Sequence, residues 1–421
     1  MKIFLILPIL LFSLYSLIFI LCNDDSSFFT IHGQPDIKTT KSRDIVIDLG
    51  NSIKTNARLS IPIIGNGPFP GVLLVQGSGA IDMNTRPSVQ IAEYLSERGF
   101  AVLQYNKRAI GEINTILDSN LWGNITFNDL QQDAEKALDV FIQQPEVDAN
   151  RITILGHSQG ATITPRVAID NPDKVKNIVL MSVLAQNLSK IIELQGVTTP
   201  VQYAKEVLDH NHDGLFSLQE ANKDPFFRDM VGNLLIHPTQ QNNTITTTAN
   251  DTTISTSSSS LEQQQLNSKY NTNSDVYVSI DNELKPKLLD IIQSLSVVKP
   301  GMKCIDINSC PIWIKSEYAL QPNLNIIGNV SSNTSILILQ GENDMQTPVQ
   351  QAILLQQKLT DVKHPDHILI TYPNLGHFFY PSSQLLTEVG PIQENVLKDL
   401  YLWLESHSGL IPLMRTTNSF Q

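Results

Sequence analysis

The feature that most constrains this chain is a Gly-x-Ser-x-Gly motif at residues 156–160, with Ser158 at its centre. The apolar, β-branched run 152–155 leads directly into the motif, and the helix-compatible stretch 161–169 follows it. A strand, this turn and a helix in that order form the context of a nucleophile elbow. The two glycines let the backbone turn sharply, and the helix start points N–H groups at any oxyanion that forms there. We therefore expect Ser158 to be an exposed nucleophile.

Strand-like runs alternate with helical patterns on both sides of this motif. The helical patterns cover residues 88–98, 128–143 and 348–359. Strands that alternate with helices predict βαβ units and a mostly parallel sheet. No helix separates the first two runs, so we expect them to form an antiparallel hairpin at one edge. The strand-like runs are residues 45–47, 58–64, 71–76, 100–105, 152–155, 177–181, 336–340 and 368–372.

The alternation breaks once, and the break divides the chain into segments. A chain of 421 residues, 41% of them apolar, is long enough for one large domain with an insertion. Residues 237–275 are dominated by Asn, Thr, Ser and Gln, a composition that cannot bury enough apolar surface, so we expect a disordered loop. The expected segments are a leader at 1–22, a linker at 23–43, a first core part at 44–185, a cap insertion at 186–334, a second core part at 335–408 and a tail at 409–421.

The leader is an uncharged apolar run from residue 3 to residue 21. It can just span a bilayer core of ~30 Å. No small-x-small cleavage site precedes Asn23, so we favour an uncleaved anchor, with secretion after signal cleavage as the alternative. Lys2 on one flank and two aspartates on the other favour an extracytoplasmic body tethered to the membrane.

Cys304 and Cys310 are the only cysteines outside the leader. An oxidising compartment would make them a disulfide, and two free thiols in a cytosolic protein are the alternative. Zinc is not expected, because two cysteines without a nearby histidine supply half the usual ligands. Asn-x-Ser/Thr sequons would also suit a glycosylated, exported body, and they begin at Asn124, Asn187, Asn242, Asn250, Asn329 and Asn333.

Two residues at strand ends complete a catalytic constellation with Ser158. A serine hydroxyl is a poor nucleophile at neutral pH and needs a base that a third group orients. Asp344 follows one strand-like run and His377 follows the next, where catalytic groups of open α/β sheets collect. The chain order Ser158, Asp344, His377 is the order that a nucleophile elbow requires. Glu342 is the second candidate for the acid.

These motifs resemble the α/β-hydrolase superfamily over roughly residues 45–185 and 334–407. Residues 76–82 and 105–108 are most similar to its esterase and acyl-peptidase branch. The resemblance implies an α/β-hydrolase fold, a mostly parallel sheet flanked by helices, with a helical cap.

By position, the resemblance also implies a role for each site residue. Ser158 is the nucleophile, His377 the general base and acid, and Asp344 the group that orients His377. The backbone N–H groups of Ser78 and Gln159 would form the oxyanion hole. The sequence departs from the family at residue 76, where Gln stands in place of the usual His. No cofactor is expected for catalysis.

A second pattern, at residues 209–220, fits the EF-hand calcium loop at every specified position, with Gly214 at the sharp turn. A chance Asp/Asn-rich turn is the alternative. We find no second copy in the sequence, and a lone hand outside the cell suits millimolar Ca²⁺ in a structural role. The expected ligands are Asp209, Asn211, Asp213, Leu215 through its carbonyl, Ser217 and Glu220.

These patterns together predict a serine hydrolase that cleaves small-molecule carboxylic esters through an acyl-enzyme. A peptidase or amidase acting on short acyl-peptides uses the same residues and stays open. A catalytically silent, calcium-stabilised surface binding module is a third possibility. The 29 basic and 41 acidic residues give a net charge of −12, which argues against a nucleic-acid partner.

Overall fold

The computed structural model describes residues 39–224, 227, 277–295, 304, 310–382, 388 and 390–410. The predicted leader and the Asn- and Ser-rich segment 237–275 lie outside these residues, so what we infer for them stays a prediction. Among the helices of the described ranges, none is both long and apolar enough to cross a bilayer.

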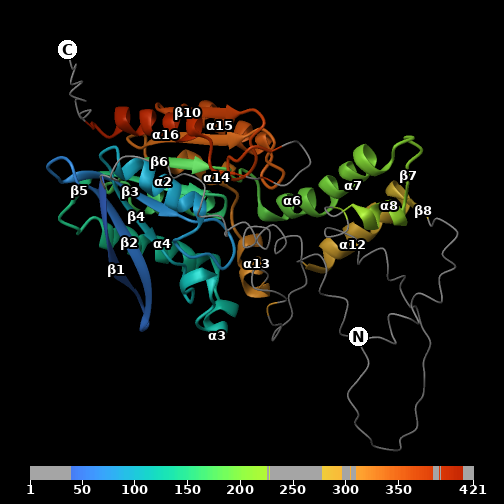
Figure 1. Ribbon diagram of the computed structural model, residues 1–421, viewed down its shortest axis with the longest axis horizontal. Coiled ribbons are helices and arrows are strands. Elements are labelled where there is room, and N and C mark those ends of the chain that lie inside the picture. The colour runs from blue at the N-terminus through green and yellow to red at the C-terminus, as the bar shows by residue number, and fades with distance from the viewer. Residues whose placement is uncertain are drawn as a thin grey trace, which may run out of the picture. The chain divides into compact units, whose positions relative to one another are not determined.

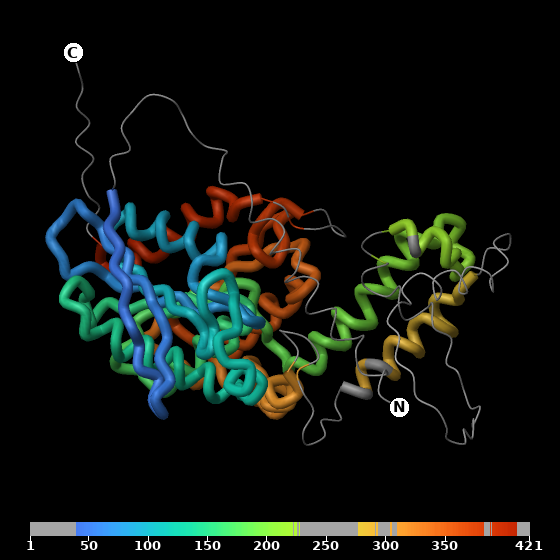
Figure 2. The backbone as a smooth tube through the Cα atoms, turned by 60° about the horizontal axis from the view of Figure 1, so that its bottom comes forward, coloured from blue at the N-terminus to red at the C-terminus, as the bar shows by residue number. Residues whose placement is uncertain are grey.

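The described residues contain an eight-stranded sheet in the order β1-β2-β4-β3-β5-β6-β9-β10. The two pairs at one edge, β1 with β2 and β2 with β4, are antiparallel, and the other pairs are parallel. The mostly parallel sheet and the edge hairpin are thus confirmed, and Figure 2 shows β1 and β2 running side by side. The strands are β1 (Thr40–Gly50), β2 (Ile53–Pro62), β3 (Phe69–Val75), β4 (Ala101–Tyr105), β5 (Val147–His157), β6 (Val175–Met181), β9 (Ser335–Gly341) and β10 (His367–Tyr372). β1 therefore starts inside the segment expected to be a linker.

Helices cover both faces of this sheet (Figure 1). Along each central strand, alternate side chains enter different cores: Leu73 packs on one face and Leu74 on the other, as do Ile338 and Leu339. One face carries α4 (Phe127–Phe141), α5 (Gln159–Asp170) and α15 (Val349–Asp361). The other carries α2 (Arg86–Ser96) and α16 (Glu394–His407). Burial on both faces explains why the strands read as continuous apolar runs.

The described residues form two compact units, one within 1–195 and 292–421 and the other within 196–291. The first unit retains parts of the predicted insertion, namely α6 (Leu188–Glu193), α13 (Pro311–Tyr318), α14 (Asn323–Ile326) and η6 (Ile327–Asn329). It also contains η1 (Glu112–Asn114) and α3 (Ser119–Gly123). A π-helical turn, η2 (Leu194–Thr198), spans the boundary.

The second unit holds the predicted calcium loop. Helical residues precede the loop and follow it. The loop also contains a short strand, β7, that pairs antiparallel with β8. We did not predict this partner strand from the sequence. The elements are α7 (Thr199–Tyr203), η3 (Ala204–Leu208), β7 (Leu215–Ser217), α8 (Leu218–Lys223), β8 (Tyr277–Ser279), η5 (Ile280–Leu284) and α12 (Lys285–Leu295).

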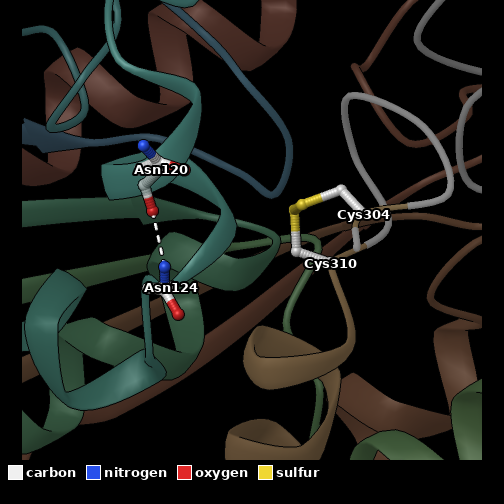
Figure 3. The surroundings of a disulfide bond; sticks show 4 residues. All are labelled: Asn120, Asn124, Cys304 and Cys310. Atoms are coloured by element: carbon white, nitrogen blue, oxygen red, sulfur yellow. Dashed lines mark hydrogen bonds between the residues drawn. A yellow bond between two sulfur atoms is a disulfide. The ribbon is translucent and has the colours of Figure 1, made fainter. Parts of the chain in front are cut away.

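The predicted cysteine pair is present as a disulfide between Cys304 and Cys310 (Figure 3). Cys310 is 3% exposed and immediately precedes α13. A Cβ on Gly123 would lie 3.3 Å from Cys304 Sγ, so the disulfide packs against the end of α3. Asn124, the first sequon, is exposed beside it and donates to the Asn120 carbonyl at 2.7 Å.

The strand order reverses between β3 and β5, because β4 lies on one side of β3 and the later strands lie on the other. Loops that leave the carboxyl ends of strands at such a switch point diverge and leave a crevice for ligands. The segment 76–78 leaves β3 at this point and Ser158 leaves β5. Asp344 and His377 follow β9 and β10 at the same edge.

Candidate active site

The turn that carries Ser158 is strained and tightly packed. Ser158 has φ 55° and ψ −116°, a conformation that costs energy for a residue with a side chain. A Cβ on Gly160 would lie 2.0 Å from the carbonyl oxygen of Val75. A Cβ on Gly156 would lie 2.2 Å from the carbonyl oxygen of Gly160 and 2.4 Å from Thr164 Oγ1. The glycines are thus required for close approach, and the left-handed conformation falls on the serine, contrary to our expectation.

The loop after β3 lies directly against this turn. A Cβ on Gly77 would be 3.4 Å from Ser158 Cβ and 3.3 Å from His157 Nδ1. Ser78, Ser158 and Gln159 line one pocket. Gln159 is the first residue of α5, where helix N–H groups have no partner inside the helix. The two predicted oxyanion-hole residues therefore flank the serine.

Asp344 and His377 form a buried pair, with exposed fractions of 3% and 2%. His377 Nδ1 lies 2.9 Å from Asp344 Oδ2 and 3.1 Å from Oδ1. The carboxylate also accepts hydrogen bonds from the backbone N–H groups of Gln346 (2.9 Å) and Thr347 (2.7 Å). The Thr347 hydroxyl donates to it at 2.6 Å and the Gln340 side-chain amide at 2.9 Å. Because Nδ1 faces the carboxylate, Nε2 is the nitrogen left for proton transfer.

The pair is electrostatically coupled. Burial opposes ionisation of Asp344, but the charge of His377 and hydrogen bonds from His377 and Thr347 outweigh it and hold the pKa of the carboxyl below its usual 3.8. Burial likewise opposes protonation of His377, yet the charge and hydrogen bond of Asp344 and the charge of Glu388 raise the pKa of this imidazole above 6.5. The pair is arranged to stabilise an imidazolium.

Backbone contacts hold His377 beside the serine turn. Its carbonyl accepts the Ser182 hydroxyl at 2.7 Å and lies 2.9 Å from His157 Nε2. The Glu388 carboxylate accepts the N–H groups of His377 and of Phe378, the latter at 2.7 Å. Burial lowers the pKa of His157 to about 3, helped by the charge of His377, so His157 is neutral and serves as a packing residue.

Glu342, the second candidate for the acid, and Asp82 in the loop after β3 have structural partners instead. Glu342 is exposed and accepts a hydrogen bond from the Thr371 hydroxyl at 2.8 Å. Asp82 accepts the backbone N–H groups of Asn84 at 2.7 Å and Asn114 at 3.1 Å, which fixes the loop after β3. Neither competes with Asp344 for contact with His377.

A buried polar chain under the serine turn was missed by sequence reasoning. Lys107 Nζ donates to the carbonyl of Gly77 and, at 2.9 Å, to Gln159 Oε1. The Gln159 amide donates in turn to Glu317 of α13. Burial lowers the pKa of Lys107 to about 7 against the opposing charge of Glu317. Burial raises the pKa of Glu317 to about 7, against the Gln159 hydrogen bond and the charges of Lys107 and Arg166.

Arg108, the next residue, binds a different set of partners. Its guanidinium binds Asp133 through Nε at 2.8 Å and Nη2 at 2.6 Å, and Asp129 through Nη1 at 2.8 Å. Both acids lie on α4. Arg108 is therefore a structural link between the end of β4 and a helix.

The pocket beside Ser158 has a mixed lining. Trp313 and Leu320 with three residues of the 184–191 segment supply apolar surface. Side-chain amides also line it, as does the buried carboxylate of Glu317. Such a pocket suits a small ligand with both apolar and hydrogen-bonding parts. The amide side chains are Gln159, Gln186, Asn187, Gln195, Gln321, Asn323 and Gln346.

The 209–220 loop is held by its own hydrogen bonds. Asp209 accepts the N–H groups of Asp213 at 3.0 Å and Gly214 at 2.8 Å, and Asp213 accepts that of Leu215 at 2.9 Å. The Asn211 amide donates to Asp213 Oδ2 at 2.9 Å. Glu220 is exposed. Across the described residues, no three His, Cys, Asp or Glu side chains gather closely enough to hold a metal ion.

The chain is similar to known proteins of one family. The profile of the alpha/beta hydrolase fold matches residues 70–383. Esterase EstD of Thermotoga maritima is 32% identical over 143 residues, a segment that spans 33% of this chain and 32% of EstD. The alpha/beta hydrolase GrgF from Penicillium sp. sh18 aligns with a TM-score of 0.48 at 13% identity, over 88% of this chain and 99% of GrgF. Est1E from Butyrivibrio proteoclasticus aligns with a TM-score of 0.43 at 13% identity, over 87% of this chain and 99% of Est1E.

Substitution Gly160→Ala tests the close approach at the serine turn. The new methyl group would overlap a backbone carbonyl that cannot move without displacing β3, so we expect a loss of about 3 kcal/mol or more in the free energy of unfolding. Gly328→Ala is the control, because the atoms nearest to its methyl group would be those of the Val362 side chain, the closest at 3.3 Å. Urea denaturation measures both, and a Gly160→Ala protein as stable as the control would contradict the packing described.

Proposed function

Because the chain belongs to the α/β-hydrolase family, we propose that this hydrolase is a serine esterase acting on small-molecule carboxylic esters. The observation that carries the proposal is the buried Asp344–His377 contact at the sheet edge where Ser158 stands. The local similarity to Esterase EstD supports the choice of esters. That similarity covers about a third of EstD, so substrate and activity are inferences for this chain.

The proposed reaction follows from the side chains at this edge. Ser158 Oγ attacks the acyl carbon while His377 Nε2 takes the hydroxyl proton, and Asp344 stabilises the imidazolium. The N–H groups of Ser78 and Gln159 bind the oxyanion of the tetrahedral intermediate. Its collapse expels the alcohol, which takes the proton from His377, and leaves an acyl-enzyme. Water deprotonated by His377 then attacks the acyl carbon, the bond to Ser158 Oγ breaks, and this oxygen takes the proton back from His377 as the acid leaves.

The pocket lining supports esters with a short acyl chain. Its apolar surface is limited to a few side chains, and amide groups interrupt it. A long alkyl chain would bury those amides without hydrogen bonds, which costs free energy. A peptide or amide bond differs only in its leaving group, so the comparison of substrates must include anilides.

We also propose that the 209–220 loop binds Ca²⁺ as a structural ion. Oxygen-bearing groups occupy every ligand position of the EF-hand pattern. Hydrogen bonds within the loop already give it a turned conformation: Asp213 Oδ1 accepts the N–H of Leu215 and Oδ2 accepts the Asn211 amide. Asn, Ser and a backbone carbonyl complete the donor set and are oxygen ligands that calcium accepts.

Covalent labelling tests the nucleophile. A fluorophosphonate should modify Ser158, and Ser158→Ala should abolish labelling and lower kcat roughly 10⁵-fold or more on p-nitrophenyl esters. Ser96→Ala, a buried serine on α2 that bonds the Glu93 carbonyl, is the control and should keep both. Butyrate should be cleaved faster than palmitate, and aminoacyl-anilides slower than either ester. A folded wild-type protein that resists labelling would instead be a catalytically silent binding module.

The pH dependence of kcat/KM tests the base. His377 must be neutral to accept a proton, and its pKa is raised. Activity should therefore fall as the pH is lowered, and the midpoint of this acid limb should lie above pH 6.5. Glu388→Gln removes a charge that favours the imidazolium and should move the limb to lower pH. The exposed Glu342→Gln is the matched control and should leave it in place. An acid limb below pH 6, or one that Glu388→Gln does not move, would speak against His377 as the base.

Calcium titration tests the loop. With a dissociation constant of about 1 mM, 10 mM Ca²⁺ should stabilise the protein by roughly 1.4 kcal/mol, and chelation should remove this gain. Glu220→Gln should weaken the effect, whereas Glu206→Gln, an exposed acid on the preceding helix, should not. A melting temperature that is the same with calcium and with chelator would exclude the site.

A further inference from the structure

We propose that Lys107 is a positioning residue that holds both arms of the oxyanion hole in the orientation that the tetrahedral intermediate requires. The inference rests on the serine hydrolase function proposed above. It goes beyond that function, because neither the motif nor the triad explains why a lysine with 5% of its surface exposed lies under the serine turn. Lysine is almost never this buried unless it is paired.

The first arm is the peptide bond between Gly77 and Ser78. Lys107 Nζ donates to the Gly77 carbonyl at one end of this peptide. In a trans peptide the C=O and N–H bonds point in opposite directions, so the Ser78 N–H points away from the ammonium group. Ser78 and Ser158 line the same pocket, and a Cβ on Gly77 would lie 3.4 Å from Ser158 Cβ. Nζ therefore orients this peptide and, when protonated, also draws electron density away from the N–H at the other end of it.

The second arm is Gln159. Its backbone N–H is the other oxyanion donor, and its side chain accepts a hydrogen bond from the same ammonium group at 2.9 Å. The side-chain amide then donates to the Glu317 carboxylate. With one end of the amide on a cation and the other on an acid, Gln159 has a single favourable orientation. One buried ammonium thus connects two segments that are far apart in sequence and that must present donors to one oxygen.

Arg108 shows that the local fold does not need Lys107 for its stability alone. The buried ion pairs of Arg108 with Asp133 and Asp129 already attach the end of β4 to α4. Lys107 makes no ion pair within the 4 Å contacts of the described residues, and its hydrogen bonds go to a carbonyl and an amide. Burying an ammonium group against two neutral acceptors stabilises a fold less than a direct ion pair would. It is an effective way to pre-organise donors in a water-excluded site.

The decisive experiment compares Lys107→Met, which keeps an unbranched side chain one atom shorter and removes the charge and donors, with the wild-type enzyme. Active sites are first counted by fluorophosphonate labelling so that kcat refers to folded enzyme. An interaction that acts in the transition state lowers kcat and leaves KM nearly unchanged. We expect a fall of roughly 10- to 100-fold in kcat, less than the ~10²–10³-fold loss from removing a whole oxyanion donor.

A boronic acid inhibitor gives an independent readout, because its tetrahedral adduct places an oxygen in the hole. Its affinity should fall in Lys107→Met by the same factor as kcat, whereas the carboxylic acid product should bind as before. Gln159→Leu breaks the second arm only and should show a smaller loss of the same kind. The double variant should lose no more than Lys107→Met, because the two groups act as a unit.

Arg108→Lys is the matched control. It should lower the melting temperature through its weakened bidentate contact, with kcat per labelled site unchanged. If Lys107→Met behaves in this way, with kcat and boronate affinity within threefold of wild type, the positioning role is wrong. Should Lys107→Met not fold, an unchanged kcat in Gln159→Leu refutes the role in the same manner. A wild-type protein that neither labels nor hydrolyses esters would instead refute the underlying hydrolase function.

Discussion

The close contact of two backbone segments at the switch point of the sheet is the constraint on which the rest depends. Gly160 lies so near the end of β3 that even a methyl group would collide with the Val75 carbonyl. This contact fixes the loop that follows β3 against the turn that follows β5. A serine hydroxyl from one segment and a backbone N–H from the other can therefore be held at one point without a flexible linker between them.

The reactivity proposed for this site depends on buried ionisable groups. The site excludes water from Asp344, His377 and Lys107, each of which is at most 5% exposed. In such surroundings a charge is costly unless hydrogen bonds replace its hydration, and every one of these groups has them. In the same surroundings, electrostatic interactions between fixed charges are stronger than they would be in water. The acid stabilises a proton on His377, and the ammonium stabilises the orientation of neutral donors.

The sequence predicted those parts that sit directly at strand ends. Ser158, Asp344 and His377 each follow an apolar run, so the parallel sheet alone brings them to one edge. Lys107 and Glu317 could not be paired in this way. Their connection passes through Gln159, and α13 lies late in the predicted cap insertion, where the Cys304–Cys310 disulfide precedes it. The strain on Ser158 was likewise hidden, because Gly-x-Ser-x-Gly does not say which of its residues adopts positive φ.

A crystal structure of the enzyme after reaction with a fluorophosphonate tests the central claim most directly. The account predicts phosphorus on Ser158 Oγ, with the phosphoryl oxygen about 3 Å from the N–H groups of Ser78 and Gln159. His377 Nε2 should lie within hydrogen-bond reach of the serine oxygen. An adduct on another residue, or a phosphoryl oxygen turned away from both N–H groups, would contradict the account.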